Sequence, residues 1–287
     1  HSRPTAACHK MPVSSNVRLH MIRTVVVQDW KEIAKLEIEW PMDLYRGQSD
    51  SSWPVASSLY RALGSRSMLE GGTNVEFWML RDFRRGASRY LSRQPPDQDF
   101  VGWLSLMQHH GAPTRLIDFT RSFYVACYFA LIDAQTDAAI WAIDPDFLLE
   151  IAESAFSVER EGLRDEWENM STSCANKLLG TLLTTASNTE PDEFQKGVVL
   201  VDPFEMHARL SAQQGLFLMP LDLESDFTTN LRPFRKRGKY PIKKIVLKHS
   251  LRITALAHLR EMNITAETLF PGIDGFARSL LQRQRVF

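Results

Sequence analysis

The stretch that decides the fold is Gln-His-His-Gly-Ala-Pro-Thr-Arg-Leu-Ile-Asp-Phe-Thr, residues 108–120. Apolar residues at helical spacing precede it. We expect that helix to end at Gly111, because glycine adopts a left-handed C-terminal conformation without penalty. Pro113 prevents the helix from resuming. Residues 114–119 are compatible with a short β-strand but include an Arg and an Asp. Burying an unpaired charge is costly, so these groups must pair or face a cleft, and we look for function here.

The composition is that of an ordinary globular protein without a global charge. Among 287 residues, 34 Lys plus Arg balance 34 Asp plus Glu. This balance gives no argument for a nucleic-acid or membrane partner, although the basic segment 232–239 is either a solvated loop or a local nucleic-acid surface. Three cysteines without CxxC spacing indicate a reducing compartment. No apolar run approaches the ~20 residues that span a bilayer, so we expect a cytoplasmic protein that does not contact the membrane.

The chain shows no internal repeat and no linker that divides it. We therefore expect one domain over residues 21–287, after a disordered leader or artificial remnant at residues 1–20. The patterns predict strands at residues 25–27, 44–48, 114–119, 139–143, 198–201, 216–219 and 242–247. They predict helices at residues 30–40, 74–94, 98–110, 122–133, 203–212, 251–261 and 273–284.

Helices and strands alternate without regular βαβ periodicity. This predicts an α+β fold with a mixed, mainly antiparallel sheet and flanking helices. Ala126 and Ala130 lie four residues apart in a nearly apolar helix, and this small-residue stripe would let the helix lie close against the sheet. Residues 145–195 read as helical and then loop-rich, and their role stays open.

Motifs of several common enzyme classes are missing. The sequence has no GxGxxG, P-loop, GxSxG or HExxH pattern. His109 and His110 are adjacent, and neighbours on a regular element do not converge on one metal ion. Cys127 lies in an apolar helix without a basic neighbour, where a thiol is usually inert. We therefore expect no metal site, and flavin, Mg-ATP and catalytic-triad chemistry are disfavoured.

Several motifs together resemble the FRG domain family, which is named for a Phe/Tyr-Arg-Gly motif. Residues 45–47 are Tyr-Arg-Gly, and residues 108–120 are similar to the family's Gln-His-His-Gly-x-Pro-Thr-Arg segment. Three further family segments are matched in the same order along the chain, by residues 126–130, by Arg209 with residues 213–217, and by residues 269–275.

The order of these parts is also similar, more distantly, to ADP-ribosyltransferases of the Arg-Ser-Glu kind. In that fold an Arg on the first strand holds a phosphate of NAD, a Ser or Thr supports the ribose, and a Glu stabilises an oxocarbenium-like transition state. Arg is suited to this because its planar fork matches phosphate oxygens, and Gly47 would let a ligand approach the backbone. The resemblance implies NAD as the substrate, with a cofactor-binding set of Arg46, Gln48, Thr120 and Arg115, and a reacting set of His109, Asp118 and Gln214.

One departure from that pattern is serious. Where the transferase would carry a glutamate, this chain has Gln213 and Gln214. A neutral amide supplies no negative charge to a cation-like transition state. Three hypotheses stay open: a weaker transferase, chemistry supported by His109 or Asp118, and a nucleotide-binding module without turnover.

The leading hypothesis is an FRG-like domain that binds an NAD-like nucleotide and acts as an ADP-ribosyltransferase or NAD-cleaving effector. The resemblance suggests a toxin or anti-phage setting. The alternative is a non-catalytic domain that recognises protein or nucleic acid through the same polar cleft and residues 232–239. Structural roles compete with the functional ones, because Arg46 could pair with Asp118 and His109 could cap its helix. Trp53 and Trp103 are more typical of a core than of a stacking platform.

Overall fold

The computed structural model describes residues 22–39, 44–64, 71–148, 167–185, 196–231 and 240–285. The expected leader at residues 1–20 and the basic segment 232–239 lie outside these residues, as do parts of residues 145–195. Within the described ranges, none of the helices is both long enough and apolar enough to cross a membrane.

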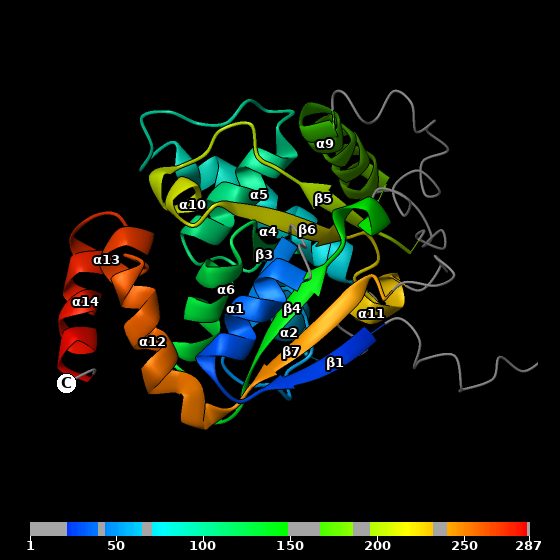
Figure 1. The fold of residues 1–287 in the computed structure, drawn as a ribbon. Helices are drawn as coiled ribbons and strands as arrows, with labels where there is room; N and C mark the ends of the chain where they lie inside the picture. The colour runs from blue at the N-terminus through cyan, green and yellow to red at the C-terminus, as the bar shows by residue number, and fades with distance from the viewer. Residues whose placement is uncertain are drawn as a thin grey trace, which may run out of the picture.

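A seven-stranded sheet in the order β1-β7-β4-β2-β3-β6-β5 forms the centre of the molecule (Figure 1). Every neighbouring pair is antiparallel except β1 and β7, which are parallel. The arrangement confirms the predicted α+β fold with a mixed, mainly antiparallel sheet. The strands are β1 (Ile22–Val27), β2 (Leu44–Gln48), β3 (Ile117–Thr120), β4 (Ala138–Ile143), β5 (Val198–Val201), β6 (Gly215–Pro220) and β7 (Ile242–Leu247).

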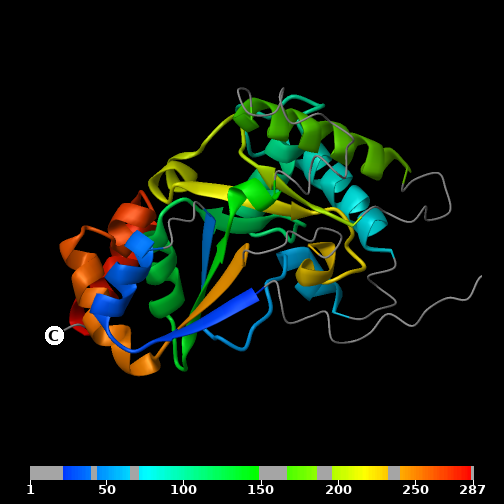
Figure 2. The same cartoon turned by 45° about the vertical axis from the view of Figure 1, so that its right-hand side comes forward.

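Two groups of helices flank the sheet, one beside each half (Figures 1 and 2). The first group shares an apolar cluster with β2, β4 and β7 and includes α1 (Trp30–Glu39), α6 (Phe123–Leu131) and α12 (Arg252–Glu261). The second shares a cluster with β5 and β6 and includes α4 (Gly72–Ala87), α5 (Phe100–His109) and α9 (Trp167–Thr185). The shorter or terminal helices are α2 (Ser58–Leu63), α10 (Ala208–Ala212), α11 (Phe227–Asn230), η2 (His249–Leu251), α13 (Ala266–Leu269) and α14 (Ile273–Arg285).

Helix α5 and the turn after it follow the predicted local chemistry. The Asp99 side chain caps the N-terminus by accepting from the Gly102 amide at 3.0 Å. At the other end Gly111 has φ +85°, the left-handed conformation that the sequence predicts. The strand that follows begins at Ile117 rather than at Thr114, because the Thr114 carbonyl accepts from the Leu59 amide at 3.0 Å instead of joining the sheet.

Two predicted helices have one end several residues inside the bounds expected from the sequence. Helix α4 ends at Ala87 rather than at residue 94, since the Arg89 amide bonds the Gly86 carbonyl in a tight turn. Helix α10 begins at Ala208 rather than at residue 203, because the His207 side chain caps it by accepting from the Leu210 amide at 3.1 Å.

Strand β2 and helix α6 approach each other at Gly47. A Cβ at this position would collide with the Ala126 carbonyl oxygen and lie 2.5 Å from the Ala130 backbone nitrogen. The small-residue stripe on α6 therefore packs closely against the sheet, as predicted. On the side where a Cβ would stand, α6 fills the space, so packing alone requires glycine here. The Gly47 backbone also belongs to the pocket lining described below, and the approach of a ligand to it stays a prediction.

The sheet is weakly joined at its centre. Strands β2 and β3 are in register only at Tyr45 and Thr120, whereas β2 pairs with β4 over five positions and β3 with β6 over four. Beyond Tyr45 the two strands separate. Groups of both strands can therefore face the gap that opens between β2 and β3. We call this gap the split of the sheet, and the candidate site lies there.

Candidate functional site

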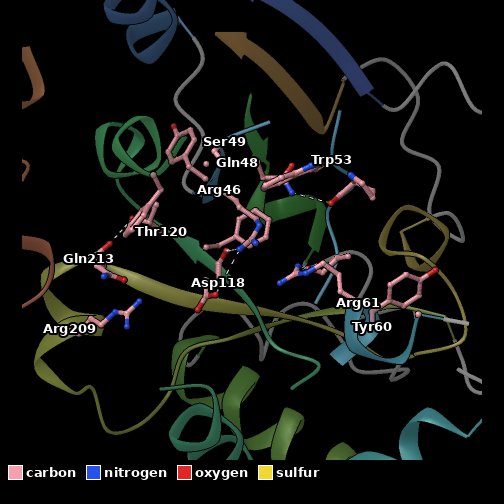
Figure 3. Close-up of a pocket in the computed structure, with 17 residues that line it drawn as sticks. Arg46, Gln48, Ser49, Trp53, Tyr60, Arg61, Asp118, Thr120, Arg209 and Gln213 are labelled. Carbon is pink, nitrogen blue, oxygen red and sulfur yellow. Dashed lines mark hydrogen bonds and ion pairs between the residues drawn. The ribbon is translucent and has the colours of Figure 1, made fainter. Parts of the chain in front are cut away.

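A pocket of about 770 Å³ opens where β2 and β3 separate (Figure 3). This volume is within the range of ordinary small-molecule sites. Its lining is drawn from β2 and the loop after it, from α2, from β3 and from α10. The polar and aromatic side chains that Figure 3 labels in this lining are Arg46, Gln48, Ser49, Trp53, Tyr60, Arg61, Asp118, Thr120, Arg209 and Gln213.

Arg46 crosses the split between the two strands. Its Nη1 donates to the Asp118 backbone carbonyl at 2.7 Å and lies 4.0 Å from the Asp118 carboxylate. Its Nε is buried and has no hydrogen-bond partner among the described residues. Burial lowers the pKa of Arg46 from its ordinary value; Asp118 opposes this effect and Arg61 adds to it. An arginine with a buried, unsatisfied donor beside a second arginine favours an anionic ligand.

Asp118 is held by a short relay through the same motif. Gln108 Nε2 donates to its Oδ1 at 2.7 Å, and the Thr114 hydroxyl donates in turn to Oε1 of the Gln108 side chain. Thr114 is fully buried and its amide donates to the Ser58 hydroxyl at 3.0 Å. The chain of hydrogen bonds from Thr114 through Gln108 to Asp118 is therefore anchored in the core. The Asp118 side chain itself is 67% exposed. The relay aims an accessible carboxylate into the pocket.

The charges that line the pocket are unbalanced. Arg61 donates to the Ala56 carbonyl at 2.7 Å, and the Arg209 guanidinium lies 4.7 Å from the centre of the Phe270 ring. With Arg46 these make three arginines against a single carboxylate, Asp118, among the described residues of the lining. The resulting positive potential would concentrate anions such as phosphates.

Gln48 and Thr120 lie in the lining as predicted, but the protein already uses much of their hydrogen-bonding capacity. The Gln48 amide accepts from Trp141 Nε1 at 2.7 Å and donates to the Pro54 carbonyl at 3.1 Å. The Thr120 hydroxyl donates to the Gln213 carbonyl at 2.7 Å and accepts from the Ser122 amide at 3.0 Å. Both residues therefore shape the pocket walls.

Arg115 is absent from the pocket lining, contrary to its predicted cofactor-binding role. It is fully buried and its Nε donates to the Glu76 carboxylate at 2.5 Å. Its amide bonds the same carboxylate at 3.0 Å, and its Nη1 donates to the Leu221 carbonyl at 3.2 Å. Because Arg115 precedes the regular part of β3, its side chain enters the core beneath α4 while Asp118 faces the pocket.

His109 and Gln214 are also outside the described pocket lining. His109 is exposed, with its ring 4.2 Å from that of His207 and 5.0 Å from that of His110. Burial, followed by the charges of His110 and Arg209, lowers the pKa of His109. Gln214 occupies a turn with φ +46°, and its neighbour Gln213 lines the pocket instead.

The lining contains several residues that were not predicted as site residues, among them Arg61, Tyr60, Arg209 and Trp53. Trp53 was expected in the core but is 52% exposed, whereas Trp103 is 2% exposed and lies in the core as expected. A sequence signal existed for Arg209, which belongs to a segment that resembles the family. Arg61 lies on the short helix α2, where no motif marks it.

The described part of the chain contains no cluster of three or more His, Cys, Asp or Glu side chains suited to holding a metal ion. Cys127 is fully buried, and burial raises the pKa of its thiol. The pocket at the split is therefore the site on which the functional argument rests.

Comparison with known proteins agrees with the motifs. The sequence model of the FRG domain matches residues 42–139, which run from just before β2 into the start of β4. The match includes the Tyr-Arg-Gly at residues 45–47 and the whole of residues 108–120. No curated protein and no solved structure matches the chain. Residues 42–139, which supply most of the pocket, are thus identified as an FRG domain.

Proposed function

We propose that the pocket binds an NAD-like dinucleotide and that the protein acts as an ADP-ribosyltransferase or NAD-cleaving effector. The observation that carries the proposal is Arg46 at the split of the sheet, with a buried Nε that no described residue satisfies and with Arg61 and Asp118 beside it. Two guanidinium groups near one another match the charge and fork geometry of a diphosphate. The toxin or anti-phage setting is part of the proposal and is supported by the resemblance alone.

Aromatic side chains support a nucleotide at the same end of the pocket. Trp53 and Tyr60 line it together with Arg61, and the Trp53 ring is half exposed (Figure 3). An exposed ring such as that of Trp53, beside a cationic group, is suited to stacking a base whose phosphates the arginines hold.

Asp118 is our candidate for the reacting end. In the proposed reaction the bond between the ribose anomeric carbon and the nicotinamide nitrogen breaks, and its electron pair leaves with the nicotinamide. The ribose then carries an oxocarbenium-like charge, which a nearby carboxylate stabilises until water or an acceptor oxygen or nitrogen attacks and loses its proton. Asp118 supplies the negative charge that Gln213 and Gln214 cannot.

Calorimetry with NAD tests the binding step. We expect Arg46→Gln to weaken NAD binding at least ~10-fold, equivalent to ~1.4 kcal/mol. Arg81→Gln is the control, because it removes a guanidinium that lies over the Trp78 ring and is not among the described residues lining the pocket. Equal NAD binding by wild type and Arg46→Gln, or no binding by wild type, would overturn the proposal.

An assay for free nicotinamide tests the reaction. We expect Asp118→Asn to lower nicotinamide release by ~10²-fold or more, the scale of a lost transition-state interaction, while NAD binding changes only slightly. An unchanged rate in Asp118→Asn would remove Asp118 from the reacting end.

A recognition module without turnover is the second candidate function. It is favoured by the neutral Gln213 at the position where the transferase pattern requires a glutamate, and by the protein bonds already made by Gln48 and Thr120. Its basic segment 232–239 lies outside the described residues. NAD that binds without nicotinamide release, over a broad set of protein and nucleic-acid acceptors, would favour this alternative.

A further inference from the structure

A second basic feature lies at the Arg209 end of the pocket. Phe270, which follows α13, is contacted by two guanidinium groups: Arg209 of α10 lies 4.7 Å from the ring centre and Arg278 of α14 lies 4.9 Å from it. Each guanidinium is attracted electrostatically to the negative face of the aromatic ring. The ring of Phe270 thus brings together Arg209 of α10 and an arginine of α14, two helices that are distant in sequence.

The guanidinium N–H groups of Arg209 and Arg278 have no acceptor among the residues that the structure describes. Within the described ranges, neither Arg209 nor Arg278 donates a hydrogen bond to a protein group or forms an ion pair within 4.0 Å. Burial lowers the pKa of Arg209; Asp118 opposes this effect and Arg278 adds to it. A guanidinium that stacks on a ring keeps its five N–H groups in the plane, where they can meet an incoming oxyanion.

We propose that Arg209, Phe270 and Arg278 form a second phosphate subsite at the rim of the pocket. This subsite rests on the proposed function, because it takes the pocket to be a nucleotide site. It adds that the second substrate, the acceptor, carries phosphate groups. Arg209 lines the pocket, whereas Arg278 lies outside its lining. A phosphate bound by both arginines would therefore sit at the rim, on a substrate that extends out of the pocket. This arrangement fits an acceptor that is a nucleic-acid strand, with Phe270 and Phe129 as apolar surface beside its backbone.

The same phosphate chemistry has a second possible source, an additional phosphate on the dinucleotide itself. The two sources differ in a measurable way. A dinucleotide phosphate would make wild type prefer NADP to NAD. A strand phosphate would make it bind a short single-stranded RNA in the absence of any dinucleotide, with an affinity that falls as salt is added.

The test measures RNA binding by fluorescence anisotropy, with fluorescein-labelled RNA and a methylphosphonate strand of the same sequence, which lacks the backbone charge. We expect Arg278→Gln to weaken RNA binding at least ~5-fold and to reduce the slope of log affinity against log salt by about 1. The control Arg81→Gln should bind RNA as wild type does. The uncharged strand should bind weakly to wild type and Arg278→Gln alike.

The outcomes separate this inference from the proposed function, because RNA binding is measured without NAD. Equal RNA affinity in wild type and Arg278→Gln, with NAD and NADP also bound equally, would overturn the subsite. A preference for NADP that disappears in Arg278→Gln would keep the subsite and assign its phosphate to the dinucleotide. Failure of wild type to bind NAD would overturn the proposed function alone. Circular dichroism of Arg278→Gln checks that a lost affinity does not reflect unfolding.

Discussion

Two arginine–carboxylate pairs each include one residue of the segment 108–120, and they differ in whether a ligand can reach them. Arg115 and Glu76 are both fully buried, 2.5 Å apart, and further protein groups satisfy the guanidinium. Arg46 and Asp118 lie 4.0 Å apart, with side chains 18% and 67% exposed. The first pair is closed to ligands and the second is open to them.

The difference teaches how to separate architecture from function among charged residues. In a buried pair the protein itself satisfies the guanidinium donors, and the pair has a structural role, since removing either partner would leave an uncompensated buried charge. A pair at the split of the sheet with a long separation and an unsatisfied Nε retains capacity for another partner. Both pairs join an arginine to a carboxylate, so the decisive quantity is how many hydrogen-bonding groups the protein itself has satisfied.

The largest expected effect comes from breaking the closed pair. Arg115→Met should lower the free energy of unfolding by about 3–5 kcal/mol, because Glu76 would be left buried without its partner. Arg46→Met, the matched change in the open pair, should cost about 1 kcal/mol or less. Urea denaturation of both variants measures the contrast. Similar losses in the two variants would show that the pairs do not differ in kind.

Removing both charges of the buried pair tests whether an uncompensated charge causes the loss of stability. The double variant Arg115→Met/Glu76→Leu removes both buried charges and should recover much of the stability lost by Arg115→Met. A double variant no more stable than the single one would mean that the hydrogen bonds to Leu221 and Thr73, rather than the uncompensated charge, dominate the loss.

The next effect tests which side of β2 is closed. Gly47→Ala should destabilise the protein by about 1–3 kcal/mol or more, because the new methyl group meets the backbone of α6, which cannot rotate away. Thermal denaturation checks this. A stable Gly47→Ala protein would show that β2 and α6 can separate without loss of stability.

A smaller effect is expected at the turn that leads into β3. Gly111→Val should cost roughly 1 kcal/mol or more through backbone strain alone, since φ is +85° and no atom lies within 4 Å of an added Cβ. His109→Ala should change the melting temperature by only a few degrees, as its ring is exposed. A ~10²-fold loss of nicotinamide release in His109→Ala would return His109 to the reacting site.

The smallest effect is a pH dependence of stability from His207. Burial, followed by the charges of His109, Arg209 and His110, lowers the pKa of His207 from 6.5 to about 4. The unfolded chain therefore binds this proton more readily, so the stability is present above about pH 6.5 and is lost as pH falls toward 4. Because the ring is partly exposed, we expect a loss of only ~1 kcal/mol.

His207→Asn keeps an N-cap for α10 but has no titrating group. Melting temperatures measured from pH 7 to pH 4 should fall less steeply in His207→Asn than in wild type. Identical pH profiles would assign the acid sensitivity of the protein to other groups.

Local signals in the sequence predicted most of the elements. Strands β2 and β7 were predicted with the bounds they have, and the end of α5 at a left-handed Gly111 follows from turn chemistry within a few residues. The Tyr-Arg-Gly and Gln-His-His-Gly segments likewise led to the family, and Arg46 and Asp118 were placed in one site. Hydrophobic periodicity and glycine conformation act over short distances, and a linear sequence records them directly.

Contacts between distant residues decided the rest. Glu76 lies 39 residues before Arg115, and Arg46 lies 72 residues before Asp118, so no local pattern shows which carboxylate each arginine meets. The sequence alone determined that residues 108–120 end a helix, begin a strand and carry charge. Only the tertiary structure decided that Arg115 is sealed in the core, that α6 fills the space at Gly47, and that Arg61 and Arg209 complete the pocket. The physical reason is that burial and charge pairing depend on which surfaces the folded chain brings together.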